Sequence, residues 1–218
     1  MKRFILVVCI MVITVFAFNE VVYGSISGNG KNDEKVLNSV SSKLIRFHVI
    51  ANSDSVEDQN LKLKVKDEVI KFMAPILKNS NSVEQSREIL KKNDLKIKEI
   101  SAKIIKENGY DYKVNTSLSK ENFPVKTYGN ITLPEGKYEA YRILIGDAKG
   151  KNWWCVMFPP LCFVDVTKGE VADKETSAEM KKVLNDDEFN YVDNENNKVE
   201  FKFKIVEIFN NLKALIKG

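Results

Sequence analysis

Residues 44–54, LIRFHVIANSD, join an alternating strand pattern directly to the start of a helix. One face of the strand is wholly apolar and is predicted to point into the core; it consists of Ile45, Phe47, Val49 and Ala51. The other face is mixed and consists of Leu44, Arg46, His48 and Ile50. The polar residues that follow fit a capping box, made either by Asp54 and Glu57 or by Ser55 and Asp58.

Two long helices are expected after this strand. The first covers roughly residues 55–77 and has apolar stripes on two nearly opposite sides, which is typical of a helix packed between neighbours. The second covers residues 82–108, with a candidate break at Asn93–Asp94 and a natural stop at Gly109.

Strand patterns then dominate the chain. YDYKVNTSL, KYEAYRILIGD and NWWCVMF predict three strands, with DAKGK as a hairpin loop between the last two. Between the first two lies SKENFPVKTYGNITLPEG, a polar loop long enough to suggest a function. A helix over Thr176–Leu184, a strand KVEFKFK and a helix IVEIFNNLKALI close the chain. This order predicts a single α+β domain whose mostly antiparallel sheet is covered by helices.

The amino terminus has the pattern of an export segment. A short basic start is followed by an apolar run from Phe4 to Phe18 and then by small residues. Residues 1–24 are therefore a signal peptide, or an uncleaved anchor because no consensus cleavage motif is present. A linker and short leading segment, 25–40, and a domain, 41–218, are expected beyond it. In either case the domain would lie outside the cytoplasm.

The formal net charge of +4 comes from lysine and glutamate interspersed along the chain, as in KLKVKDEVIK. There is no dense basic block, so a nucleic-acid partner is not indicated. No cofactor motif is found either.

Export changes the interpretation of the cysteines. Removal of the signal would take Cys9 away and leave Cys155 and Cys162, separated by a Pro-Pro turn. In an oxidising compartment this even pair predicts a disulfide, and the alternative is two buried free thiols. Two cysteines and one distant histidine do not make a zinc site.

His48 is the one histidine of the chain, and it raises the question of catalysis. Ser53 and Asp54 are better explained as helix-capping residues, and Cys155 lies in the middle of a strand. No nucleophile elbow, metalloprotease motif or phosphate-binding loop is present. The chain is not expected to be an enzyme, and a secreted hydrolase that uses Cys155 or Ser53 with His48 is the alternative.

Several long segments resemble the stage II sporulation protein R family. They are IRFHVIANSD with the following LKLKVKDEV, FPVKTYGN, and LPEGKYEAYRILIGDAKGKNWWCVMFPPLCF. The similarity runs from about Leu44 to Asp165, whereas residues 168–198 do not match well. Tyr141 stands where the family pattern has leucine.

The resemblance implies an intercellular signal of sporulation, made in the forespore and exported into the space between the two septal membranes. There it would activate a membrane-embedded aspartic protease of the mother cell, which processes the pro-form of sigma-E. The chain would be a ligand for this protease.

The aromatic strand suggests where such a partner binds. Trp154, Val156 and Phe158 are expected in the core, and Trp153 on an outer face. Tyr128 of the polar loop would join Trp153 if the three strands form a meander, because Tyr and Trp dominate interface hot spots. Arg46 and His48, on the mixed face of the first strand, complete the predicted partner-binding residues.

Overall fold

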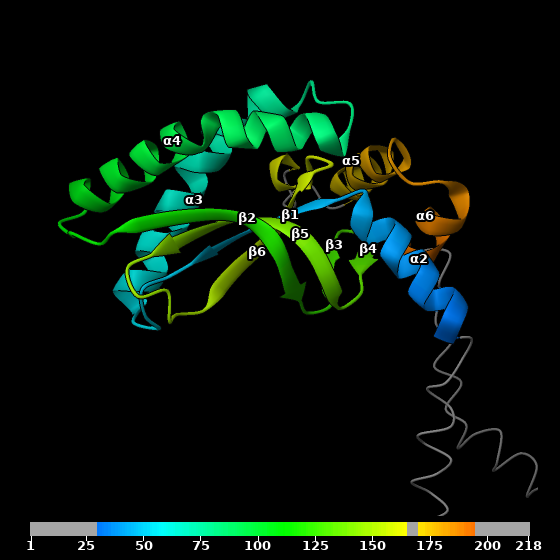
Figure 1. Ribbon diagram of the computed structural model, residues 1–218, viewed down its shortest axis with the longest axis horizontal. Coiled ribbons are helices and arrows are strands. Elements are labelled where there is room, and N and C mark those ends of the chain that lie inside the picture. Colours follow the sequence, from blue (N-terminus) through cyan, green and yellow to red (C-terminus); the bar gives the residue numbers. More distant parts are fainter. Residues whose placement is uncertain (1–29, 165–169, 195–218) are drawn as a thin grey trace, which may run out of the picture. The chain divides into compact units, whose positions relative to one another are not determined.

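The computed structural model describes residues 30–164 and 170–194 (Figure 1). The chain divides into two compact units, residues 1–38 and 39–218. In the first unit, the described residues are the beginning of helix α2 (Gly30–Ser42), which starts within the predicted linker. The second unit contains the sheet and the remaining helices. The predicted strand KVEFKFK and the last predicted helix lie outside the described residues.

A mixed four-stranded sheet organises the second unit. It consists of β1 (Ile45–Ile50), β2 (Val114–Phe123), β5 (Gly136–Ile145) and β6 (Asn152–Phe158), in the order β2-β5-β1-β6. The β2–β5 and β1–β6 pairs are antiparallel, and the β1–β5 pair is parallel. The predicted α+β class is confirmed.

The predicted hairpin between β5 and β6 is wrong, because β1 lies between these two strands. The connecting loop instead packs on the end of β1, where Gly150 N–H donates to Ala51 O and Lys149 N–H to Asn52 O. Strand β1 lies between β5 and β6, and side chains on both of its faces are buried. Ile45, Phe47 and Val49 are fully buried, as the alternating pattern predicted.

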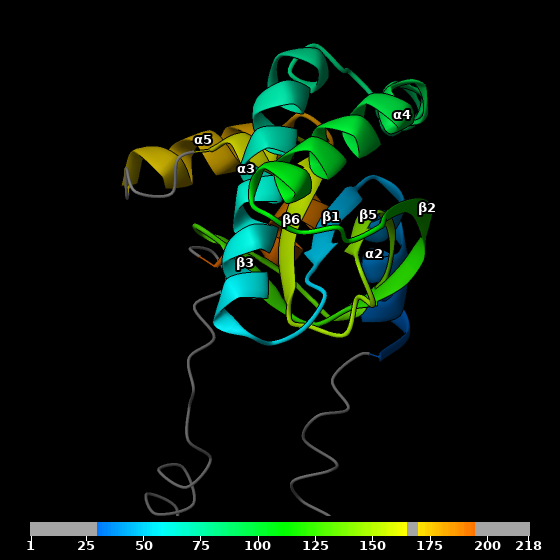
Figure 2. The same ribbon diagram turned by 90° about the vertical axis from the view of Figure 1, so that its left-hand side faces the viewer.

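Helices α3 (Val56–Leu77) and α4 (Val83–Glu107) cover one face of the sheet (Figures 1 and 2). Ser55 is the N-cap of α3 and accepts from Asp58 N–H, as expected for one half of a capping box. Helix α4 continues through Asn93–Asp94, so the predicted break is wrong. The Asn93 side chain donates to Ile89 O within the helix, and Asp94 accepts from Thr116 and Tyr141.

The predicted polar loop contains regular structure. Strand β2 extends into it as far as Phe123, and β3 (Lys126–Tyr128) pairs with β4 (Ile131–Leu133) as a short separate hairpin. After β6 come a 3₁₀ helix (Leu161–Phe163), α5 (Glu170–Lys181) and α6 (Asp186–Val192). The helix expected at Thr176–Leu184 corresponds to α5, which begins at Glu170 and ends at Lys181, and α6 was not predicted.

The two faces of β6 are the reverse of the predicted ones. Trp153 lies opposite Val49, on the face covered by helices, and Trp154 lies opposite His48 on the other face. A register shift next to Ile45 brings Phe158 back beside Ile45 in the helix-covered core. Because β6 is apolar on both sides, alternation alone does not decide which side points to the helices.

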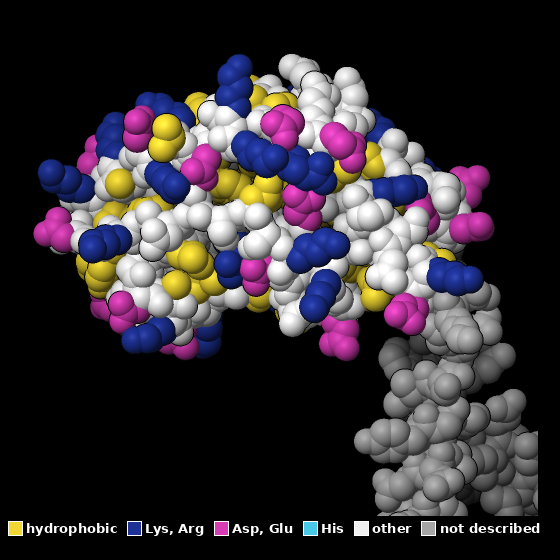
Figure 3. Space-filling model, in the orientation of Figure 1, with side chains coloured by type: hydrophobic (Ala, Val, Ile, Leu, Met, Phe, Trp, Pro, Cys, Tyr) yellow, Lys and Arg dark blue, Asp and Glu magenta, His cyan; other side chains and the backbone are white. Residues whose placement is uncertain are grey.

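The surface over α4 mixes both signs of charge, with lysine, arginine and acidic side chains interspersed (Figure 3). Pairs such as Lys91–Glu88 and Lys98–Asp94 account for part of this pattern. Over residues 30–164 and 170–194, no helix is long and apolar enough to cross a membrane.

Candidate functional site

The turn from β1 to α3 is held by a polar network. Asn52 Oδ1 accepts from Asp147 N–H at 2.9 Å, and its Nδ2 donates to Asp58. Ser53 Oγ also donates to Asp58, at 2.5 Å, and Asp54 accepts from Lys151 N–H at 2.6 Å. These hydrogen bonds hold the pKa of Asp58 below its usual range despite its burial. Residues 50–54, IANSD, therefore connect the β5–β6 loop to the start of α3 through hydrogen bonds.

The structure does not bring the residues of the alternative hydrolase together. Ser53 Oγ is committed to Asp58. Cys155 lies opposite Phe47 on the helix-covered face, whereas His48 lies on the other face. Neither ring nitrogen of His48 has a hydrogen-bond partner among the described residues. A nucleophile must lie within hydrogen-bond reach of its base, and neither candidate does.

Arg46 is the centre of an aromatic and basic cluster on the sheet face opposite α3 and α4. We call this the Trp154 cluster; it consists of Arg46, His48, Phe123, Tyr128, Tyr138 and Trp154. The Arg46 guanidinium is fully buried and lies 4.3 Å from the ring centroid of Phe123 and 4.8 Å from that of Tyr138. Its Nη2 donates to the Tyr128 hydroxyl at 2.9 Å.

His48 lies between Phe123 and Trp154 in this cluster and is a neutral ring at pH 7. It stacks on Trp154 and meets Phe123 edge-on, with centroids 4.9 and 5.2 Å apart. Burial, together with the positive charges of Arg142 and Arg46, lowers its pKa to about 4. Such an imidazole is a flat spacer between aromatic rings at neutral pH and not a base tuned for catalysis.

Two further cations border the Trp154 cluster. Lys126 Nζ lies 5.9 Å from the Trp154 ring centroid, and Arg142 is in register with His48 on the neighbouring strand. Arg142 donates from Nε to Ser117 and pairs through Nη2 with Glu121 at 3.2 Å. Trp154, Lys126 and Arg142 are partly exposed, so the border of the cluster meets solvent.

Three of the four predicted partner-binding residues lie together in this cluster: Arg46, His48 and Tyr128. Arg46 and His48 are almost fully buried, so they support the surface residues of the cluster from below, whereas Tyr128 is partly exposed. Trp153 is on the opposite face. Its ring meets Phe47 edge-on at 5.8 Å, and Lys66 Nζ lies 5.0 Å from its centroid.

Sequence reasoning missed Phe123, Trp154 and Arg142 as members or neighbours of the site. Phe123 was assigned to a loop, and Trp154 to the core. The signal that could have found Arg142 is its place in KYEAYRILIGD, where it is the basic side chain within an apolar strand pattern.

Cys155 and Cys162 are both free in the structure. Their thiols are within hydrogen-bond reach of each other, and burial raises the pKa of the Cys162 thiol. The bridge predicted from the sequence is not formed in this structure and stays a prediction.

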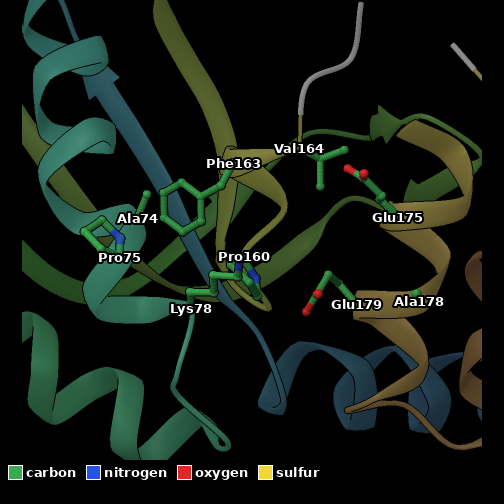
Figure 4. Close-up of a pocket in the computed structure, with 9 residues that line it drawn as sticks. All are labelled: Ala74, Pro75, Lys78, Pro160, Phe163, Val164, Glu175, Ala178 and Glu179. Atoms are coloured by element: carbon green, nitrogen blue, oxygen red, sulfur yellow. The ribbon is translucent and has the colours of Figure 1, made fainter. Parts of the chain in front are cut away.

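A separate pocket of about 480 Å³ lies between the end of α3, the 3₁₀ helix and α5 (Figure 4). Its lining is largely apolar: Ala74, Pro75, Lys78, Pro160, Phe163, Val164, Glu175, Ala178 and Glu179. None of the predicted site residues lines it. Over the same described ranges, no group of three histidine, cysteine or acidic side chains is placed to hold a metal ion.

These features define an α+β domain whose mixed sheet is covered by helices on one face and carries an aromatic and basic cluster on the other. Residues 41–168 match the family model of stage II sporulation protein R, and the chain belongs to this family. The stage II sporulation protein R of Bacillus subtilis (strain 168) is 39% identical over 152 residues, which cover 67% of this chain and 68% of that protein. No solved structure matches the chain. Family membership assigns the chain a role in stage II of sporulation.

Proposed function

We propose that this chain is an exported intercellular signal that activates a membrane-embedded aspartic protease in the sporulation septum. Activation leads to processing of the pro-form of sigma-E. The observation that carries the proposal is the 39% identity to a stage II sporulation protein R over two thirds of both chains. The export pattern of residues 1–24 and the separation of His48 from Ser53 and Cys155 support it.

A ligand activates an enzyme only if it binds the active state more tightly than the inactive one. The chain therefore needs a surface that recognises one arrangement of the protease. The partly exposed border of the Trp154 cluster is suited to this role. It combines two large aromatic rings, Tyr128 and Trp154, with two cations, Lys126 and Arg142, and all four residues are on strands. Arg46 and His48 would hold this border in place from below.

Complementation of sporulating cells that lack the gene tests the proposal. The full chain should restore cleavage of the pro-sigma factor, measured by immunoblot, and a chain without residues 2–24 should not, because it stays in the cytoplasm. A protease variant with its catalytic aspartates replaced should abolish the cleavage that the full chain restores. Cleavage that persists in that variant would show that another protease, or the chain itself, cuts the factor.

A further inference from the structure

We propose that the border of the Trp154 cluster binds an acidic, extended segment of the protease, with an apolar side chain over Trp154 and a carboxylate at Arg142. This inference rests on the proposed function and names the chemistry by which the partner is recognised.

The first observation is an excess of positive charge around the cluster. Arg46, Lys126 and Arg142 lie in or beside it, and Glu121 is the acidic group paired with any of them among the described residues. Arg46 is fully buried and has no carboxylate partner within the part of the chain that the structure describes. Burying a cation without a counter-ion costs free energy, so an anion bound near this face would offset part of the cost of burying Arg46.

The second observation is unused hydrogen-bonding capacity. Nη1 of Arg46 and both ring nitrogens of His48 are buried and find no partner in the described residues. Arg142 uses Nε for Ser117 and Nη2 for Glu121, and its Nη1 makes no hydrogen bond or ion pair to the residues that the structure describes. A guanidinium has five N–H donors in a planar fork, so Arg142 can hold Glu121 and a second carboxylate together.

The third observation is the spacing of the two recognition groups. Arg142 and Trp154 are both in register with His48, one on each neighbouring strand. Since adjacent strands lie about 4.8 Å apart, the two side chains stand about 10 Å apart across the sheet. An extended chain advances about 10 Å in three residues, so an apolar residue and an acidic residue at that spacing would reach both. A lone phosphate or lipid headgroup supplies the charge without the apolar group.

Charge reversal tests this inference. Arg142→Glu and Lys126→Glu should each weaken binding of the full chain to the protease reconstituted in nanodiscs by tenfold or more. Arg142→Gln, which removes the positive charge without placing a negative charge beside Glu121, should weaken it less. Matched reversals of Lys92 and Lys103, exposed on α4 across the sheet, should stay within twofold. Thermal unfolding of each variant must match that of the parent chain within a few degrees.

The inference would be overturned if Arg142→Glu and Lys126→Glu both fold and bind the protease as tightly as the parent chain does. The proposed function would still stand in that case, because the parent chain binds the protease. Failure of the parent chain to bind the protease would overturn both. Binding of the parent chain and the reversal variants to vesicles of anionic or zwitterionic phospholipid is measured as well. If the reversals abolish binding to anionic vesicles and leave protease binding unchanged, the face recognises lipid and the inference is wrong.

Discussion

The imidazole of His48 lies flat against the indole of Trp154, with centroids 4.9 Å apart and planes inclined by 5°. The imidazole is neutral at pH 7, because burial and the positive charges of Arg142 and Arg46 lower its pKa from 6.5 to about 4. As the pH falls from 6.5 toward 4, the unfolded chain takes up a proton that the folded chain refuses, so stability is lost in that interval. The expected loss between pH 7.5 and pH 5 is about 2 kcal/mol, measured by urea unfolding.

The control is His48→Phe, which keeps an aromatic ring and cannot titrate. His48 is the one histidine in the chain, and acidic groups contribute mainly below pH 5. The variant should therefore have nearly constant stability over the same interval. An equal loss in both proteins would mean that another group carries the pH dependence.

Tyr128→Phe should destabilise the fold by about 1.5–3 kcal/mol, because its hydroxyl accepts a hydrogen bond from the buried Arg46 guanidinium. Tyr110→Phe is a suitable control, since the ring of Tyr110 is partly exposed and stacks on Tyr112. In an Arg46→Met background the cost of Tyr128→Phe should largely disappear. Equal costs in both backgrounds would contradict the coupling.

Trp153→Ala should lower the free energy of unfolding by about 3 kcal/mol, because the ring packs on Phe47 in the helix-covered core. Trp153→Phe should recover more than half of that loss. Binding of the folded fraction to the protease should be unchanged in both variants, since Trp153 lies across the sheet from Trp154. A Trp153→Ala protein that melts normally and fails to bind would restore the assignment made from sequence.

A chain exported as proposed should contain a Cys155–Cys162 disulfide once it meets an oxidising compartment. The two thiols already lie within hydrogen-bond reach, so closure needs little movement. Intact-mass measurement under non-reducing conditions should show the loss of two hydrogens, and Cys162→Ser should leave Cys155 open to alkylation after unfolding. Complete alkylation of both cysteines without reductant would contradict the bridge.

The local elements were largely predictable from the sequence, because periodicity reports local geometry. The alternation of β1 and the helical spacing of α3 are strong, long signals, and both were confirmed. Which strands pair with one another cannot be predicted from this periodicity, because pairing joins segments that are distant in sequence. DAKGK has the composition of a hairpin turn, yet its backbone hydrogen-bonds to the end of β1, and only the folded chain shows this.

The candidate site was predictable in part for the same reason. Arg46 and His48 are conspicuous as polar groups on a strand. Their neighbours come from β2, β5 and β6, which meet only through the sheet order, and from the separate β3–β4 hairpin. Trp154 was assigned to the wrong side because both faces of its strand are apolar. Three-residue strands such as β3 are also too short to produce a detectable alternation.

The central place of β1 has a consequence for the order in which the chain becomes folded. Its two neighbours, β5 and β6, are made only after residue 135, when α3 and α4 have already been synthesised. Until then β1 is an apolar segment with two open edges, the kind of strand that pairs readily with other chains. The local contacts of α3 with α4 form early, whereas closure of the sheet depends on contacts distant in sequence and is correspondingly slow. Aggregation during synthesis is thus a hazard for this fold, and it ends when β5 and β6 close on β1.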